Sequence, residues 1–315
     1  MTLTRMAWRY LWHRPVVTAL TLAGVLLGTA LVASVLTLRR EVEEALLREG
    51  QLFDLVVGAK GSPLQLVLSS VYHLDVPTGN IPMSVFEDLM KDGRVKAAYA
   101  IGLGDNYSGY RIVGVEAPYF GLTRRGGAAV FAVAHGRLFT NAFEAVLGSQ
   151  VARQTGLRTG ATFVGYHGLM ATAGASAHRD FPYTVVGELA ATGTAQDRAI
   201  FVRLDSVWLV HEAEQIRHGN AAAPREVTSV LLQLRTAGLR MLMARRITDT
   251  TPAMAAIPLQ ELLRLFEQIL GPLHQMLLAV ALLVVVVAAL STCATLYQSA
   301  ERQRRDLAVL RTLGA

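Results

Sequence analysis

The chain has 315 residues and a formal net charge of +6, with 52% hydrophobic and only 17% charged residues. Soluble domains carry about 25% charged residues, and this composition argues against a disordered chain, a collagen or a disulfide-rich secreted protein. The single cysteine, Cys293, excludes an intrachain disulfide and a cysteine-based zinc site. The basic excess flanks two apolar runs and leaves the large middle region nearly neutral, which argues against nucleic-acid binding.

The first apolar run covers residues 16–38 and contains no charged residue. As a helix it would be roughly 35 Å long, enough to cross about 30 Å of hydrocarbon with some tilt. A cleaved signal peptide is the alternative, but its apolar part is usually only about 7–15 residues long, so an uncleaved anchor is preferred. Gly24 and Gly28 give this helix a small-residue face, and we expect them to allow close packing against another helix.

The middle region, residues 39–272, alternates short strand-like and helix-like segments, which indicates an α+β fold. The expected strands are 53–57, 95–103, 110–115, 162–166, 183–189, 199–202, 228–234 and 253–257, and the expected helices are 63–74, 83–91, 149–155, 205–217, 237–247 and one that begins at Pro258. We expect residues 39–115 and 226–272 to form a membrane-proximal lobe with strands from both segments in one sheet. Residues 116–225 would then form an outer lobe.

A second run without charge covers residues 276–298, and a second transmembrane helix is preferred to a buried core helix at this length. Arginines gather at the outer ends of both runs. They are Arg5, Arg9 and Arg14 before the first run and Arg302, Arg304 and Arg305 after the second. The positive-inside rule therefore puts residues 1–15 and 299–315 in the cytoplasm, and the middle region outside a bacterial inner membrane.

Catalytic and nucleotide-binding motifs are absent from the sequence. It contains no phosphate-binding loop and no nucleophile elbow, and Gly102-x-Gly104 lacks the third glycine of a dinucleotide fingerprint. His211-Glu212 begins like a zinc-protease motif, but position 215 is Gln instead of the second His. We therefore expect no enzyme activity, and no cofactor of the chain's own.

Several histidines of the middle region form the one remaining candidate constellation. They are His167, His178, His211 and His218, together with Glu212. The simpler interpretation is that these are ordinary solvated histidines. The alternative is a zinc site made by His167, His178 and His211, because zinc prefers imidazole and carboxylate ligands where thiols are absent. Its affinity should fall as pH drops through about 6.5, because protonated imidazole cannot bind the ion.

Four stretches resemble the FtsX-like (MacB-like) permeases of ABC transporters. The last fifteen residues, ERQRRDLAVLRTLGA, resemble the cytoplasmic segment that follows the family's second span. GRLFTNAFEAVLGSQVARQTGLRTGATF and YTVVGELAATGTAQDRAIFVRL are similar to its periplasmic core domain, and AWRYLWHRP to its N-terminal amphipathic segment. The matching positions of the terminal segment are Glu301, Arg302, Arg305, Asp306, Leu307, Leu310, Arg311, Leu313, Gly314 and Ala315.

The resemblance implies the permease subunit of an ABC complex that works by mechanotransmission. A separate cytoplasmic ATPase would bind the ATP and contact the terminal segment, whose Leu307, Leu310 and Leu313 lie at helical spacing and could enter a groove on that partner. A second permease copy and a periplasmic adaptor or lipoprotein are further implied partners. Family members carry four spans, so the end at Ala315 implies a fragment or a truncated gene.

Two other functions stay open at this point. A two-span sensor with an extracytoplasmic ligand-binding domain would need a heptad-bearing signalling helix and an output domain after the second run, and residues 302–315 offer neither. A membrane-anchored periplasmic enzyme is disfavoured by the motif search. The substrate and the direction of transport are not specified by the sequence.

Overall fold

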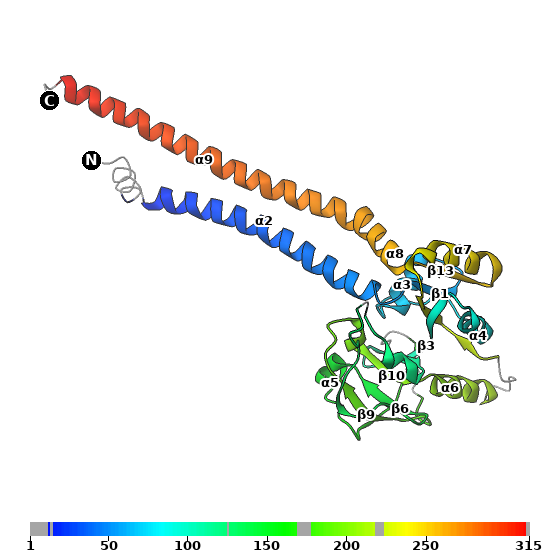
Figure 1. The fold of residues 1–315 in the computed structure, drawn as a ribbon. Coiled ribbons are helices and arrows are strands. Elements are labelled where there is room, and N and C mark those ends of the chain that lie inside the picture. Colours follow the sequence, from blue (N-terminus) through cyan, green and yellow to red (C-terminus); the bar gives the residue numbers. More distant parts are fainter. Residues whose placement is uncertain (1–11, 13–14, 125, 169–177, 218–223, 313–315) are drawn as a thin grey trace. The chain divides into compact units, whose positions relative to one another are not determined.

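The computed structural model describes residues 12, 15–124, 126–168, 178–217 and 224–312 of the chain (Figure 1). The chain divides into two units. The first comprises Met1–Glu43 and Leu265–Ala315, and the second comprises Glu44–Arg264. The second unit falls within the region for which the sequence predicted a separate α+β domain.

Two long helices dominate the described part of the first unit. They are α2 (Pro15–Gly50), whose last turns belong to the second unit, and α9 (Gly271–Thr312). Each covers one apolar run and continues past it into charged sequence. A π-helical turn, η4 (Phe266–Leu270), joins α9 to α8 (Pro258–Leu265). Within the described residues, no helix combines the length and apolar character that a membrane crossing requires, so the two predicted spans are not confirmed.

The second unit is built on one large mixed sheet. Its strand order is β13-β1-β12-β3-β4-β10-β6-β9-β5, with β7 attached to β9 and β8 attached to β3. The strands are β1 (Leu55–Ala59), β3 (Val95–Tyr107), β4 (Tyr110–Val115), β5 (Val133–Gly136), β6 (Glu144–Leu147), β7 (Thr162–Phe163), β8 (Tyr166–His167), β9 (Tyr183–Leu189), β10 (Ala199–Arg203), β12 (Ser229–Leu234) and β13 (Ala253–Ala256). A small second sheet pairs β2 (Ile81–Pro82) with β11 (Glu226–Val227).

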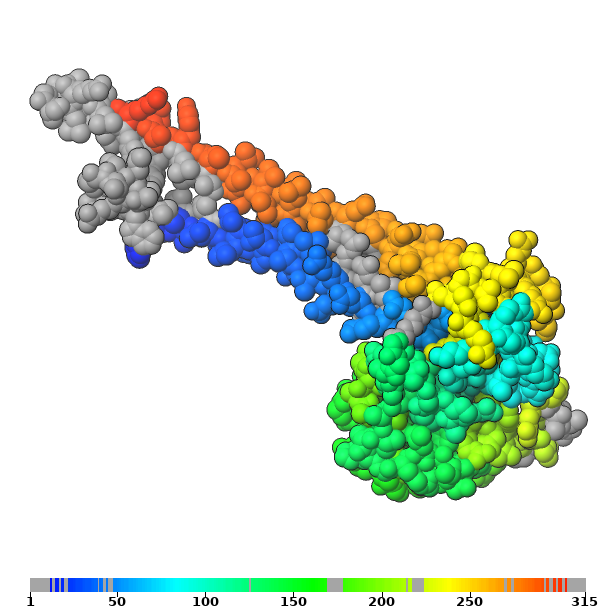
Figure 2. Space-filling model, viewed as in Figure 1, coloured from blue at the N-terminus to red at the C-terminus, as the bar shows by residue number. Residues whose placement is uncertain are grey.

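Strands from distant parts of the chain are neighbours in the large sheet. β1 pairs antiparallel with both β12 and β13, as predicted for the early and late segments of the domain. Figure 2 shows these segments, cyan and yellow, packed side by side. β4 pairs in parallel with β10, so the sheet continues into strands of the predicted outer lobe. The lobe boundaries themselves stay a prediction.

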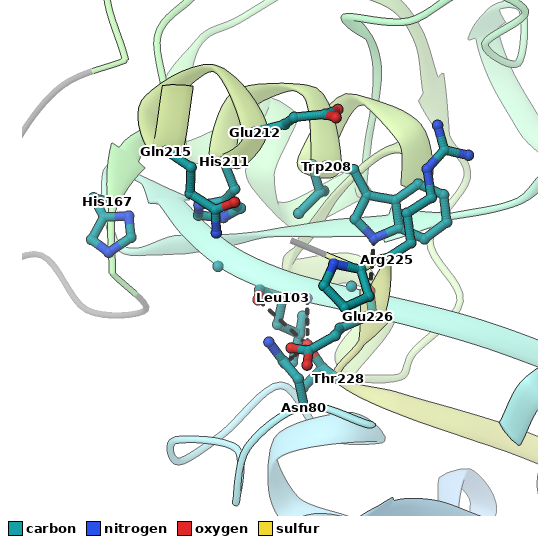
Figure 3. Close-up of a pocket in the computed structure, with 14 residues that line it drawn as sticks. Asn80, Leu103, His167, Trp208, His211, Glu212, Gln215, Arg225, Glu226 and Thr228 are labelled. Carbon is teal, nitrogen blue, oxygen red and sulfur yellow. Dashed lines mark hydrogen bonds between the residues drawn. The ribbon is translucent and has the colours of Figure 1, made fainter. Parts of the chain in front are cut away.

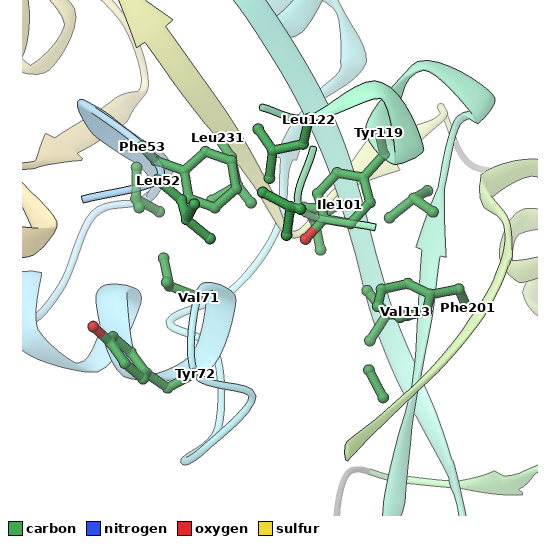
Figure 4. Packing of buried hydrophobic residues seen from close by; sticks show 14 of the residues in the cluster. Leu52, Phe53, Val71, Tyr72, Ile101, Val113, Tyr119, Leu122, Phe201 and Leu231 are labelled. Carbon is green, nitrogen blue, oxygen red and sulfur yellow. The ribbon is translucent and has the colours of Figure 1, made fainter. Parts of the chain in front are cut away.

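Helices of the second unit cover the sheet. They are α3 (Pro63–Ser70), α4 (Met83–Lys91), α5 (Ser149–Thr155), α6 (Leu204–Arg217) and α7 (Arg240–Thr250). In α4 the apolar residues at helical spacing, Val85, Phe86 and Leu89, are buried in a core cluster with the β-sheet residues. A second cluster is aromatic: the rings of Tyr119 and Phe201 lie 5.9 Å apart and pack with Ile101 and Leu231 (Figure 4). Burial of such side chains is the main stabilising contribution to the domain.

The structure corrects the end of the first helix in this domain. Its start agrees with the prediction, because Pro63 occupies the first turn and the Ser62 hydroxyl accepts a hydrogen bond from the Gln65 amide. The helix was predicted to reach residue 74 but ends at Ser70. His73 and Asp75 adopt positive φ values of 54° and 62°, a conformation that cannot continue a right-handed helix.

Candidate functional site

The candidate site begins on β3, the longest strand of the domain. Asp105 lies near its end, and its carboxylate is buried with a side-chain exposure of 2%. The short strand β8 pairs antiparallel with this end of β3, in a register that puts His167 directly opposite Asp105. The sheet therefore brings an imidazole and a carboxylate together although 62 residues separate them along the chain.

A second imidazole reaches the same carboxylate from the segment before β9. The His178 backbone amide donates to the Gly165 carbonyl, which fixes this segment beside the end of β8. The His178 side chain is 1% exposed, and its Nε2 lies 3.1 Å from Asp105 Oδ1. His167 is 54% exposed, and its Nδ1 lies 3.8 Å from the same oxygen. One ligand-type atom from each of these three residues lies within 4.8 Å of the other two.

A third imidazole, His211, comes from α6. Its ring centroid lies 5.6 Å from that of His167 and 6.2 Å from that of His178. The absence of a side chain at Gly104 permits this approach, because a Cβ there would lie 2.6 Å from His211 Nε2. Three imidazoles and one carboxylate therefore meet at the junction of β3, β8 and α6, and we name Asp105, His167, His178 and His211 the histidine cluster.

A cleft of about 410 Å³ adjoins the histidine cluster (Figure 3). Its lining residues come from β3, β8, α6, the segment around β11 and the residue before β2, and they include both His167 and His211. At the far end the Arg225 guanidinium lies 4.9 Å above the Trp208 ring, and Trp208 Nε1 donates to the Glu226 carbonyl. The cleft therefore has an imidazole end and a guanidinium–indole end.

The structure brings together the three histidines for which the sequence raised a shared site: His167, His178 and His211. His218 lies outside the described residues. Glu212 lines the cleft, but Figure 3 shows its carboxylate pointing away from the imidazoles. Asp105 was missed, because the expected strand ended at residue 103, whereas β3 continues to Tyr107, and a single acidic residue between two expected strands has no spacing signal.

Gly24 and Gly28, predicted to allow helix packing, lie where α2 and α9 of the first unit approach each other. A Cβ at Gly28 would lie 2.8 Å from Val285 Cγ2, and one at Gly24 would lie 3.4 Å from Ala288 Cβ. A larger side chain at position 28 would therefore require the valine or the helix to move.

The residues expected to contact an ATPase fall at the end of the chain. Those within α9 are Glu301, Arg302, Arg305, Asp306, Leu307, Leu310 and Arg311. The predicted separate helix is thus a continuation of α9. Leu313 and Gly314 lie outside the described residues. The coupling role of the whole set stays a prediction.

The relationship of the chain to known proteins follows from a comparison with family models. The model described as MacB-like periplasmic core domain matches residues 18–249. The chain belongs to this family. The match confirms the resemblance stated from the sequence, and it covers the histidine cluster and every strand of the large sheet except β13. Domains of this family are components of transporters.

Solved structures of similar proteins are distant in sequence. The extracellular domain of the noncanonic ABC-type transporter YknZ from Gram-positive bacteria is 12% identical, with a TM-score of 0.37 over 64% of this chain and 98% of that one. The periplasmic region of MacB from Actinobacillus actinomycetemcomitans is 11% identical, with a TM-score of 0.42 over 70% of this chain and 95% of that one. No curated protein matches the chain.

Proposed function

We propose that this chain is the permease subunit of an ABC transporter complex, anchored in the bacterial inner membrane with its α+β domain outside the cytoplasm. The observation that carries the proposal is the family match over residues 18–249, because the family is named for a periplasmic domain. The two uncharged runs at 16–38 and 276–298, one on each side of that domain, support two membrane spans. The flanking arginines support the orientation.

In the proposed mechanism, a partner ATPase supplies the energy and the chain transmits the movement. The chain leaves the domain in helical conformation at both ends, through α2 and through α8, η4 and α9. A helix keeps its own length under load, so movement at its cytoplasmic end can be passed along it. The complex would act on a periplasmic or outer-membrane substrate, with a second permease copy and a periplasmic adaptor or lipoprotein as further partners.

Topology is the first test of this proposal. A reporter that is active only outside the cytoplasm should be active when fused after Gly193 and silent when fused after Ala315. Fusions to a reporter active only in the cytoplasm provide the control and should give the reverse pattern. Activity of the first reporter after Ala315 would overturn the orientation read from the arginines.

The ATPase partner is tested by co-purification. The chain alone should hydrolyse no ATP, and co-expression with a cognate ABC ATPase should give a complex. Leu310→Asp should weaken that complex, because a charge would enter an apolar contact, whereas Leu310→Met keeps the contact apolar and should preserve it. Equal recovery of the ATPase with both variants would remove the coupling role from residues 301–315.

A further inference from the structure

The chemistry of the histidine cluster matches a known class of metal site. Asp105, His167 and His178 supply one carboxylate and two imidazoles, with no thiol among them, and this donor set is typical of zinc sites that keep a coordination position open. We propose that the histidine cluster binds one Zn²⁺ ion, with Asp105, His167 and His178 as ligands and His211 beside the fourth position. The proposal does not depend on the transport function.

The distances within the cluster suit one ion. A tetrahedral zinc ion with bonds of about 2.0–2.2 Å holds its ligand atoms about 3.3–3.6 Å apart. Asp105 Oδ1 lies 3.1 Å from His178 Nε2 and 3.8 Å from His167 Nδ1. Since all three ligand atoms lie within 4.8 Å of one another, a side-chain shift of about 1 Å closes the set around an ion.

The backbone holds the ligands in place before any ion arrives. The Gly168 amide donates to the Gly104 carbonyl at 2.9 Å, and Asn106 Nδ2 donates to the Gly168 carbonyl at 2.8 Å, so the residue after His167 is bound to both neighbours of Asp105 on β3. The His178 amide donates to the Gly165 carbonyl at 3.0 Å. Ligands fixed in this way lose little conformational entropy on binding, which favours affinity.

Burial and exposure divide the cluster into a protected and an open side. Asp105 and His178 are almost fully buried, and a buried carboxylate is costly unless it is paired or binds a cation. His167 is exposed and lines the cleft together with His211. The cleft thus provides an entry path for the ion, and a place for water or an anionic group at the fourth position.

Metal titration of the full chain tests the proposal. The chain, purified in detergent and freed of metal with a chelator, should bind one Zn²⁺ per molecule by calorimetry and elemental analysis. His167→Ala should lower the affinity by roughly 100-fold or more, because it removes a ligand. His167 is exposed, so the variant should keep its fold, which circular dichroism checks. His178→Gln should lower the affinity similarly.

A matched control separates this site from general imidazole binding. His135→Ala removes another exposed histidine of the same domain, on β5, and should leave the zinc affinity unchanged. Co²⁺ as a spectroscopic probe should give the intense visible absorption of a tetrahedral site, and His167→Ala should abolish it. An affinity equal in His167→Ala and His135→Ala, or a zinc content well below one per chain, would overturn the proposal.

Discussion

Glu49, in the last turn of α2, accepts a hydrogen bond from Gln196 Nε2 at 3.0 Å, although the two residues are 147 positions apart in the chain. The other Glu49 oxygen accepts from the Ala195 amide at 2.9 Å. Gln196 also binds His73 Nε2 and the Tyr119 hydroxyl through its own Oε1. A buried polar network therefore joins the end of α2 to the segment before β10.

Two members of this network have pKa values shifted in opposite senses by burial. Burial raises the pKa of Glu49 to about 7, although hydrogen bonds from Ala195 and Gln196 lower it in part and the Asp197 charge adds to the rise. Burial lowers the pKa of His73 to about 4, opposed by its hydrogen bond to Gln196 and assisted by the charge of Arg111. Both side chains are therefore driven toward their neutral forms.

We predict that Glu49→Gln changes the pH dependence of stability. The stability that comes from the raised pKa of Glu49 is fully present below about pH 4.5 and is lost as pH rises through about 7. The lowered pKa of His73 has the opposite effect, because it makes stability rise from about pH 4 to 6.5. The two slopes oppose each other in the wild type. In Glu49→Gln only the effect of His73 remains, so the free energy of unfolding should rise between about pH 4 and 6.5.

Chemical denaturation between pH 4.5 and 8 measures this effect. The free energy of unfolding of Glu49→Gln, relative to the wild type, should increase by about 3 kcal/mol across that range. His73→Gln should instead show a steeper fall with pH than the wild type. Parallel pH profiles for the wild type and Glu49→Gln would mean that Glu49 titrates normally.

The ion pair between Asp54 and Arg240 carries a second prediction. Asp54 is buried immediately before β1. Its carboxylate lies 2.6 Å from the Arg240 guanidinium at the start of α7 and accepts a hydrogen bond from the Leu234 amide. Arg240→Met leaves that buried carboxylate without its cation, so the free energy of unfolding should fall by about 3 kcal/mol. Arg245→Met, which breaks the exposed pair with Asp249, should cost less than about 0.5 kcal/mol. Similar losses of unfolding free energy in Arg240→Met and Arg245→Met would show that burial does not make the first ion pair more important for stability.

Elements with a clear local pattern were predicted closely from the sequence. Three elements have the predicted bounds: Met83–Lys91 and Ser149–Thr155, which end just before a glycine, and the largely apolar strand Tyr183–Leu189. β5 was missed, since its four residues are all exposed and show no alternation. The strand order of the sheet could not be predicted from the sequence either, because the pairing of β4 with β10 depends on contacts between distant segments.

The candidate site was predictable only in part, for the same reason. The histidines are visible in the sequence by residue type alone, and their spacing does not say whether they meet. Their meeting depends on the register of β8 against β3, which pairs His167 with Asp105. That register is set by packing and backbone hydrogen bonds across the domain, so the carboxylate at the centre of the cluster had no local signal.

Close contact between β5 and β9 carries a third prediction. Gly136 and Gly187 face each other in the register of these strands. A Cβ at Gly187 would overlap the Arg137 carbonyl oxygen, and one at Gly136 the Val186 carbonyl oxygen. Gly187→Ala must therefore push the strands apart, and we expect a loss of about 1–3 kcal/mol in the free energy of unfolding.

Thermal unfolding of Gly187→Ala compared with Gly93→Ala checks this. A Cβ at Gly93 meets no atom within 4 Å, and that variant should stay within about 0.5 kcal/mol of the wild type. Hydrogen exchange of the β5 amides should be faster in Gly187→Ala, because the displaced strand opens more often. Unchanged exchange there would show that the sheet edge adapts without separating.

The contact between Gly104 and His211 gives the last prediction. Its test shows whether His211 is the fourth zinc ligand. Gly104→Ala adds a methyl group 2.6 Å from His211 Nε2, and the imidazole, as the far end of a half-buried side chain, can turn away at little cost. We therefore expect the free energy of unfolding without metal to change by less than about 1 kcal/mol. Zinc affinity should nevertheless fall by roughly tenfold or more if the ring contributes to the site. Zinc titration of Gly104→Ala and His211→Ala measures this directly, and wild-type affinity in both variants would leave Asp105, His167 and His178 as the complete set of protein ligands.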